Sequence, residues 1–329
     1  MSSFFVSGSD AVDYDRCVLP EHLKGRDLLC VNDWSPEDLL AVLDLADRLK
    51  AERKDGVRHE LLPGRTLGMI FEKPSTRTRA SFGVGIAQLG GTGLYLTAGD
   101  LQLGRGEPIR DTAIVLSRYL DAILIRTFRQ ADVDELARHA DVPVINGLTD
   151  EFHPCQALAD VMTIRERFGS FAGVRVAFVG DGNNTCHSLM VACAKLGADV
   201  VVATPPGYEP RADVTGWARA AAERSGSTVE VVRDPRAAAA GADVLYTDVW
   251  TSMGQERERE RRLRDFAGYR IDEALLRLAT ERAVVMHDLP AHYGEEVTEQ
   301  VLHGARSAAW DQAENRLHTA KALLALIVP

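Results

Sequence analysis

Hydroxyl residues and arginines alternate in one short stretch of the chain, Ser75-Thr76-Arg77-Thr78-Arg79. The apolar run 66–71 before this stretch is typical of a buried strand, and residues 80–89 after it have the apolar spacing of a helix. Ser75 is therefore expected near a helix N-cap, where unpaired backbone N–H groups and the helix dipole attract an anion. Hydroxyls and guanidinium forks suit phosphate, so the stretch predicts a phosphate-binding loop. An ordinary Ser/Thr cap with two surface arginines is the alternative.

A second group of chemical interest is His153-Pro154-Cys155-Gln156, which combines a neutral hydrogen-bond donor, a proline suited to a helix start and an amide. His153 could donate to a carbonyl oxygen that becomes negative in a transition state, although a lone His is more often structural. Neither His153 with Cys155 nor Cys186 with His187 supplies more than two ligands, so no metal site is predicted.

The segment Asp248-Val249-Trp250-Thr251-Ser252-Met253-Gly254 places an acid at the end of a predicted strand and a hydroxyl, a thioether and a glycine in the loop after it. A carboxylate there suits the cationic amine of a substrate. A strand-end Asp that caps the following turn is the alternative.

The loop Gly180-Asp181-Gly182-Asn183-Asn184-Thr185 follows another predicted strand and begins like a dinucleotide-binding fingerprint. The pattern fails at Thr185, where a third glycine is required, and no ribose-binding acid ends the next strand. No organic cofactor is predicted, and a nicotinamide-dependent oxidoreductase remains a distant alternative.

Strands and helices alternate along the chain, which predicts an α/β protein with two doubly wound parallel-sheet domains. We expect a first domain over 1–150 and a second over 151–312, with a C-terminal helix at 313–329 that packs back on the first. Ligands bind at the carboxyl ends of strands in such sheets, and the candidate residues fall on both halves, so the site is expected in the interdomain cleft. Predicted strands lie at 66–71, 94–96, 122–126, 143–146, 174–180, 199–203, 228–232, 243–248 and 283–287. Predicted helices lie at 35–49, 75–89, 109–119, 132–139, 155–168, 188–196, 212–224 and 313–327.

Two polar stretches are expected outside the packed core. Residues 1–20 are predicted to form a polar tail or arm. The alternating charges of 256–262 are predicted to form a solvated helical face.

The composition narrows the class of protein. A length of 329 residues suits about two domains. Lys+Arg 38 against Asp+Glu 48 gives a net charge of −10 without a long basic run, which argues against nucleic acid and acidic membranes as partners. The five cysteines are widely spaced, as expected for reduced thiols in the cytoplasm. No apolar run reaches the roughly 18 residues of a membrane span.

Together the motifs resemble the aspartate/ornithine carbamoyltransferase family over nearly the whole chain. Residues 75–79 resemble its carbamoyl-phosphate loop, and 153–156 resemble its H-P-x-Q element. Residues 248–254 resemble the D-x-x-x-S-M-G loop of the ornithine branch, which the aspartate branch lacks, and Phe71-Glu72-Lys73-Pro74 also points to the ornithine branch.

The resemblance implies transfer of the carbamoyl group of carbamoyl phosphate to the side-chain amine of an amino acid, foremost L-ornithine, giving L-citrulline and phosphate. It implies no metal or organic cofactor, and a homotrimer or a multiple of trimers. The carbamoyl phosphate site would comprise Ser75, Thr76, Arg77, Thr78, Arg126, His153, Gln156, Leu289 and Arg316. The amine site would comprise Asn184, Asp248, Ser252, Met253 and Asp288. The catalytic groups would be Arg77, Arg126, His153, Asp248 and Asp288.

One position departs from the pattern of the ornithine branch. The chain has His287-Asp288-Leu289-Pro290 where that branch has H-C-L-P, so a carboxylate replaces a thiol. Two acids around an ammonium raise its pKa and hinder its deprotonation. Asp288 is expected to act as a base or to bind a second cationic group. The alternatives are therefore a specialised carbamoyltransferase for putrescine, lysine or 2,3-diaminopropionate and, more distantly, a non-catalytic relative that binds a phosphorylated metabolite.

Overall fold

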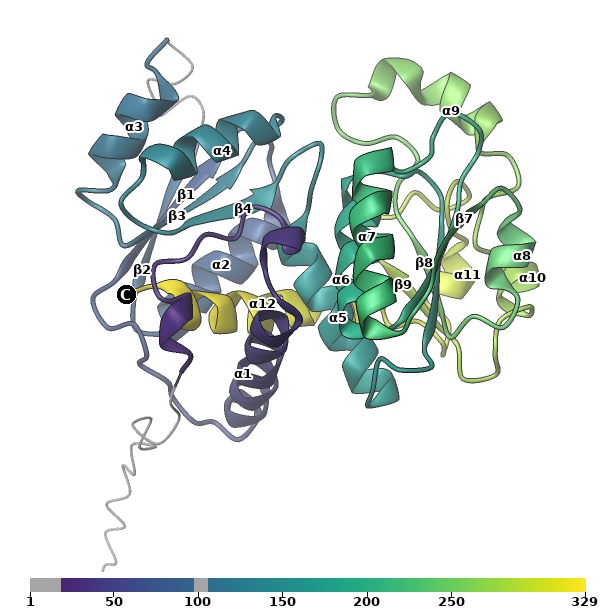
Figure 1. Cartoon of the computed structure of the whole chain (residues 1–329), viewed down its shortest axis with the longest axis horizontal. Helices are drawn as coiled ribbons and strands as arrows, with labels where there is room; N and C mark the ends of the chain where they lie inside the picture. Colours follow the sequence, from purple (N-terminus) through teal and green to yellow (C-terminus); the bar gives the residue numbers. More distant parts are fainter. Residues whose placement is uncertain (1–18, 98–105) are drawn as a thin grey trace, which may run out of the picture.

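A computed structural model describes residues 19–97 and 106–329. Most of the predicted N-terminal tail, and the start of the polar loop before residue 109, lie outside the described residues. Figure 1 shows two α/β lobes side by side, the first containing β1 to β4 and the second β5 to β9. The predicted fold class is confirmed, because every pairing within both sheets is parallel.

The first lobe is built on a four-stranded sheet in the order β2-β1-β3-β4. Phe71, the last residue of β1, lies opposite Arg126, the last residue of β3. The register therefore places Arg126 next to the loop that follows β1. The strands are β1 (Thr66–Phe71), β2 (Thr92–Thr97), β3 (Ala122–Arg126) and β4 (Val144–Leu148). The helices are α1 (Pro36–Lys54), α2 (Thr76–Gln88), α3 (Ile109–Leu116) and α4 (Gln130–His139).

The second lobe is built on a five-stranded sheet in the order β7-β6-β5-β8-β9. The strand order reverses between β5 and β8, and ligands of doubly wound sheets bind at such a switch point. The loops after β5 and β8 contain Asn183 and Asp248. The strands are β5 (Arg175–Val179), β6 (Asp199–Ala203), β7 (Val229–Val232), β8 (Val244–Thr247) and β9 (Val284–His287). The helices are α6 (Asn184–Leu196), α7 (Ala212–Ser225), α8 (Pro235–Ala239), α9 (Arg259–Asp265), α10 (Glu273–Leu276) and α11 (Glu299–Leu302).

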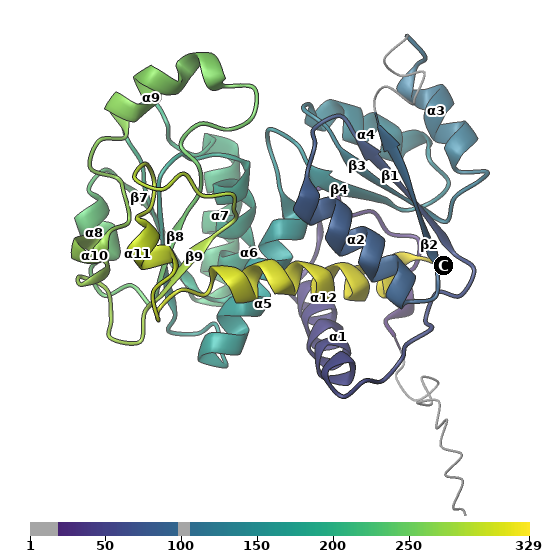
Figure 2. The same cartoon turned by 180° about the vertical axis from the view of Figure 1, so that it is seen from behind.

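Two long helices, α5 (Pro154–Phe168) and α12 (Ala309–Ile327), join the lobes. Figure 2 shows α12 leaving the second lobe and crossing to the first, where the chain ends. The helix packs on α5, α2 and α1. One apolar cluster runs through this junction and includes Leu43 of α1, Met162 of α5 and Leu323 of α12. The lobes therefore share a core around these helices.

Several predicted boundaries were wrong for local reasons. The helix predicted from residue 188 begins at Asn184, because the Asn183 side chain accepts a hydrogen bond from the backbone N–H of Cys186 at 3.0 Å and caps the helix. Helix α3 ends at Leu116, before the predicted 119, and α12 begins at Ala309, before the predicted 313. The short helices α8, α10 and α11 were not predicted.

The charged run 256–262 forms a short 3₁₀ turn (Glu256–Glu258) and the start of α9. The prediction of a fully solvated face was wrong for Arg262, whose relative exposure is 6%. Among the described residues, no helix is both long and apolar enough to span a membrane.

Candidate active site

A cavity of about 980 Å³ lies between the lobes, at the carboxyl ends of strands from both sheets. It brings together residues that the sequence predicted from distant motifs. The first lobe contributes Ser75, Arg77 and Arg126, and the second contributes Asn184, Asp248, Ser252, Met253, Asp288 and Leu289. Five predicted residues do not line this cavity, namely Thr76, Thr78, His153, Gln156 and Arg316.

The predicted phosphate loop forms the start of α2. The Ser75 hydroxyl accepts a hydrogen bond from the Thr78 backbone N–H at 3.2 Å, so Ser75 is the N-cap and the predicted helix start is confirmed. Lys73, which had no predicted role, is buried before the loop and forms an ion pair with Asp150. Its ammonium also lies 4.4 Å from the centre of the Phe128 ring. These contacts fix the entry to the loop.

Arg316 of α12 connects the phosphate loop to the H-P-x-Q element. One nitrogen, Nη1, donates to Gln156 Oε1 at 2.5 Å, and the other, Nη2, donates to Thr78 Oγ1 at 3.1 Å. The Nε atom of Arg316 is buried without a partner. A buried guanidinium with a free donor is suited to bind an anion.

Three guanidiniums are close enough to affect one another. Burial lowers the pKa of Arg126 to about 10. The negative charge of Asp288 raises this pKa in part, whereas the positive charges of Arg316 and Arg77 lower it further. Burial also lowers the pKa of Arg77, again against Asp288. The Nε atom of Arg126 is buried without a partner, and Arg77 Nη2 donates to the Leu289 carbonyl at 2.5 Å. This concentration of positive charge favours a multiply charged anion.

His153 lies at the N-cap of α5 and is almost fully buried. Its backbone N–H donates to the Ser188 hydroxyl at 2.8 Å, and its ring Nδ1 has no partner. Burial, followed by the charges of Arg316 and Arg126, holds the pKa of His153 well below its ordinary value. The imidazole is therefore neutral near pH 7 and can donate a single ring N–H.

Two carboxylates, Asp248 and Asp288, line the same cavity. Asp248 Oδ2 accepts from Asn183 Nδ2 at 2.8 Å, and Asp248 Oδ1 accepts from the Val249 N–H at 2.8 Å. Burial and then the charge of Asp288 raise the pKa of Asp248 to about 7. Asp288 itself accepts from Thr185 Oγ1 at 3.3 Å. A pair of acids of this kind is suited to bind an ammonium group.

The other residues predicted for the amine site lie at the edge of this pair. Asn184 Nδ2 donates to the Thr149 carbonyl at 2.5 Å, so its amide connects the two lobes. The Ser252 backbone N–H donates to Gln255 Oε1 at 3.1 Å, and Met253 is 46% exposed. The Ser252–Gln255 bond thus holds the loop after β8, and Met253 lies exposed at the cavity.

A His–Glu pair orients the loop that carries Asp288. The ring Nδ1 of His287 accepts from the Leu289 N–H at 2.7 Å, and Nε2 lies 3.1 Å from Glu296 Oε1. His287 and Glu296 are both fully buried, and Leu289 has a positive φ of 64°. The pair holds the strained backbone that presents the Leu289 carbonyl to Arg77.

A buried polar network behind the site was not predicted. Asp160 Oδ1 accepts from Gln156 Nε2 at 2.8 Å and from Gln312 Nε2 at 2.7 Å. The Tyr246 hydroxyl lies 3.3 Å from both carboxyl oxygens. Burial raises the pKa of Asp160 to about 8. The signal in the sequence was an acid four residues after Gln156 in the predicted helix, a spacing that brings two side chains together.

One cluster among the described residues has the spacing of a cation site: His292, Glu295 and Glu296. Glu295 forms an ion pair with Arg259, and Glu296 Oε1 is close to His287 Nε2. Both carboxylates therefore already have basic partners, and the cluster supplies no argument for a metal.

Comparison with known proteins identifies relatives over almost the whole chain. The family model described as aspartate/ornithine carbamoyltransferase, carbamoyl-P binding domain, matches residues 26–166, and the model of the Asp/Orn binding domain matches 172–327. The ornithine carbamoyltransferase of Pyrococcus horikoshii is 57% identical over 306 residues, covering 93% of this chain and 96% of the relative. The solved structure of the Pyrococcus furiosus ornithine carbamoyltransferase is 56% identical, with a TM-score of 0.91 over 93% of this chain and 98% of the other. That of Gloeobacter violaceus is 47% identical, with a TM-score of 0.84 over 93% and 99%.

Proposed function

The chain belongs to the aspartate/ornithine carbamoyltransferase family, and from that premise we propose that it transfers the carbamoyl group of carbamoyl phosphate to the side-chain amine of L-ornithine. The products are L-citrulline and phosphate, as in arginine biosynthesis. One observation carries the proposal: Arg77 and Arg126 line the same cavity as Asp248 and Asp288, and Arg126 Nε is a buried donor without a partner. Such a site holds an anionic donor beside a cationic acceptor.

We assign the phosphate of carbamoyl phosphate to the start of α2 and the guanidiniums around it. The helix N-terminus supplies backbone N–H groups, and the hydroxyls supply further donors. Arg77 and Arg316 neutralise the charge that grows on the leaving phosphate. The phosphate ligands are Ser75, Thr76, Arg77, Thr78, Arg126 and Arg316.

The carbamoyl group then lies between Gln156, Leu289 and His153. The Leu289 carbonyl accepts from the carbamoyl N–H₂ once Arg77 turns to the phosphate. The side-chain ammonium first loses one proton to solvent, and the neutral amine attacks the carbonyl carbon. Charge develops on the carbonyl oxygen, where donors from Thr78, Arg126 and His153 stabilise it, and the C–O bond to the phosphate then breaks. A neutral His153 acts here as a donor that need not lose its proton. Alignment and electrostatics supply most of the rate, without a covalent enzyme intermediate.

The amino acid binds on the opposite side, at Asn184, Asp248, Ser252, Met253 and Asp288. Asp248 and Asp288 hold the side-chain amine in front of the carbonyl carbon. The nitrogen becomes strongly acidic once the new C–N bond forms, and Asp288 accepts the proton that it releases. This role uses the carboxylate that replaces the thiol of the ornithine branch.

The acceptor is ornithine because the relatives that share more than half of this sequence are named ornithine carbamoyltransferases. The failed dinucleotide fingerprint at Thr185 and the family membership argue against the oxidoreductase alternative. Retention of Arg77, His153 and Arg316 argues against a non-catalytic relative.

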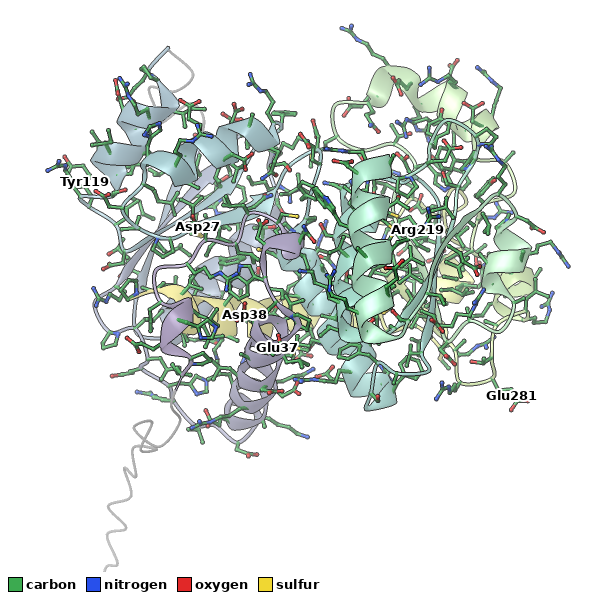
Figure 3. All side chains as sticks on the ribbon, in the orientation of Figure 1. Asp27, Glu37, Asp38, Tyr119, Arg219 and Glu281 are labelled. Carbon is green, nitrogen blue, oxygen red and sulfur yellow. The ribbon has the colours of Figure 1, made fainter. Side chains whose placement is uncertain are left out.

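We also propose that the protein is a homotrimer, or a multiple of trimers, in the cytoplasm. Large apolar side chains on the first lobe are exposed, including Val84, Leu94 and Tyr119, and Figure 3 shows Tyr119 projecting from its edge. The trimer is proposed from the family resemblance, and an interface between subunits would cover such side chains. The four cysteines in the described ranges are buried and unpaired, as expected for a reducing compartment. Light scattering after gel filtration tests the proposed mass, and a monomer would contradict it.

The experiment that tests the function measures two products at once. With carbamoyl phosphate and L-ornithine, citrulline and inorganic phosphate are expected in equal amounts, and neither forms above the uncatalysed rate without protein. Phosphate released without citrulline would indicate hydrolysis and contradict the proposal.

A further inference from the structure

Arg262 of α9 is a buried arginine on a helix whose other arginines, including Arg261 and Arg264, are exposed. Its Nη1 donates to Asp181 Oδ2 at 2.6 Å and to the Trp250 carbonyl at 2.9 Å. Its Nε donates to Glu258 at 3.1 Å. A single guanidinium therefore joins three separate stretches of chain.

Two of these stretches form the amine side of the cavity. Asp181 begins the loop after β5, and Asn183 in that loop donates to Asp248 at 2.8 Å. Trp250 directly precedes Thr251 and Ser252 in the loop after β8. Arg262 is thus a second polar link between these two loops, in addition to the Asn183–Asp248 hydrogen bond.

The surroundings hold the guanidinium in one place. The Tyr208 ring lies 5.0 Å from its central carbon, and the Trp250 ring stacks on Phe266 at 5.5 Å. Gly182, next to Asp181, packs so closely that an added Cβ would lie 2.2 Å from the Pro210 nitrogen. The loop after β5 is therefore fixed on one side by Pro210 and on the other by Arg262.

We propose that Arg262 is a positioning residue that sets the spacing of the two amine-site loops and thereby selects the length of the acceptor amino acid. The inference rests on the proposed carbamoyl transfer to ornithine and deepens it. Arg262 lines the cavity beside Asp181. Its hydrogen bonds go to Asp181, the Trp250 carbonyl and Glu258, and not to residues assigned to carbamoyl phosphate, so its replacement should affect recognition of the amine and leave carbamoyl phosphate binding unchanged.

The conservative variant Arg262→Lys tests this idea most cleanly. Lysine keeps the charge but lacks the planar fork that reaches two acceptors at once. Loss of a hydrogen bond to a charged group corresponds to roughly a tenfold to hundredfold change in binding. We expect the KM for ornithine to rise at least roughly tenfold, with kcat and the KM for carbamoyl phosphate within roughly twofold of the wild type. The preference for ornithine over lysine should fall by a similar factor.

A second variant, Asp181→Asn, removes the negative charge of the same ion pair and covers the case in which Arg262→Lys folds poorly. It should likewise raise the KM for ornithine and leave kcat and the KM for carbamoyl phosphate unchanged. Arg264→Lys on the same helix is the matched control, and it should leave all three constants unchanged. An ornithine KM within twofold of the wild type in both variants would overturn the inference, as would equal rises in the KM of both substrates. If the wild type makes no citrulline, the proposed function fails instead.

Discussion

Arg77 Nη2 lies 2.5 Å from the carbonyl oxygen of Leu289, so the phosphate loop of one lobe is bonded to the amine-side loop of the other. This bond occupies one N–H of the guanidinium and one lone pair of the carbonyl oxygen. Carbamoyl phosphate offers a partner to each, since its phosphate attracts the guanidinium and its amide N–H₂ can replace the guanidinium at the carbonyl. We therefore expect carbamoyl phosphate to replace this contact between the lobes when it binds.

Replacement of Arg77 by Ala should reduce kcat/KM by at least roughly a thousandfold, because it removes a donor to the leaving phosphate. Steady-state phosphate release measures this loss. Arg79→Ala is the matched control from the same motif, since the Arg79 guanidinium stacks 3.8 Å from the Tyr95 ring and does not line the cavity. Equal losses in the two variants would contradict the assignment.

Replacement of Asp288 by Asn should move the acid limb of the kcat/KM profile for ornithine to lower pH. Burial and the Asp288 charge together raise the pKa of Asp248 to about 7, and removal of that charge lets Asp248 ionise at lower pH. Asp288→Cys should shift the limb in the same direction. A profile that is unchanged in both variants would place Asp288 outside the amine site.

Replacement of His153 by Ala should lower kcat by roughly 10²- to 10³-fold, the effect of losing one oxyanion donor. The pKa of His153 lies well below its ordinary value, so the imidazole stays neutral across the assay range. The residual activity measured from pH 6 to pH 9 should therefore keep the shape of the wild-type profile. Disappearance of a limb near pH 6 would show that His153 titrates there and acts as a base.

Replacement of Asp160 by Asn should change how stability depends on pH. The folded-state pKa of Asp160 is about 8, above the unfolded value of about 4, so the native chain keeps a proton that the unfolded chain has lost between these values. The free energy of unfolding of the wild type therefore falls by up to about 1.4 kcal/mol for each unit that the pH rises between these two values. Urea unfolding measures the free energy of unfolding of both proteins from pH 5 to pH 9. The difference, variant minus wild type, should rise up to about pH 8 and then stay constant. A constant difference across the window would contradict the buried, protonated Asp160.

Residues whose positions follow local rules could be predicted from the sequence. Ser75 was identified as a cap because a strand, a hydroxyl and a helical pattern follow one another directly. Arg126 was identified because it ends an apolar strand, and the register of a parallel sheet brings strand ends together. The alternation of strands and helices then predicted both sheets and the cleft between them.

The missed residues depend on partners far away in the chain. Arg262 is separated from Asp181 by 81 positions, and a run of alternating charges resembles a solvated face until the folded chain supplies that acid. Asp160 and Gln312 are 152 positions apart, and only the crossing of α5 and α12 brings them together. Burial of a polar side chain is a property of tertiary packing, which local patterns do not encode.

Ornithine is expected to be the acceptor, and the values of kcat/KM for a panel of amines test this. The panel is L-ornithine, L-lysine, putrescine and 2,3-diaminopropionate, with saturating carbamoyl phosphate. The value for ornithine should exceed each of the others by at least roughly a hundredfold, since a misplaced amine loses alignment at the carbonyl carbon. Another amine that matches or exceeds ornithine would show that ornithine is not the preferred acceptor and that Asp288 serves a different substrate.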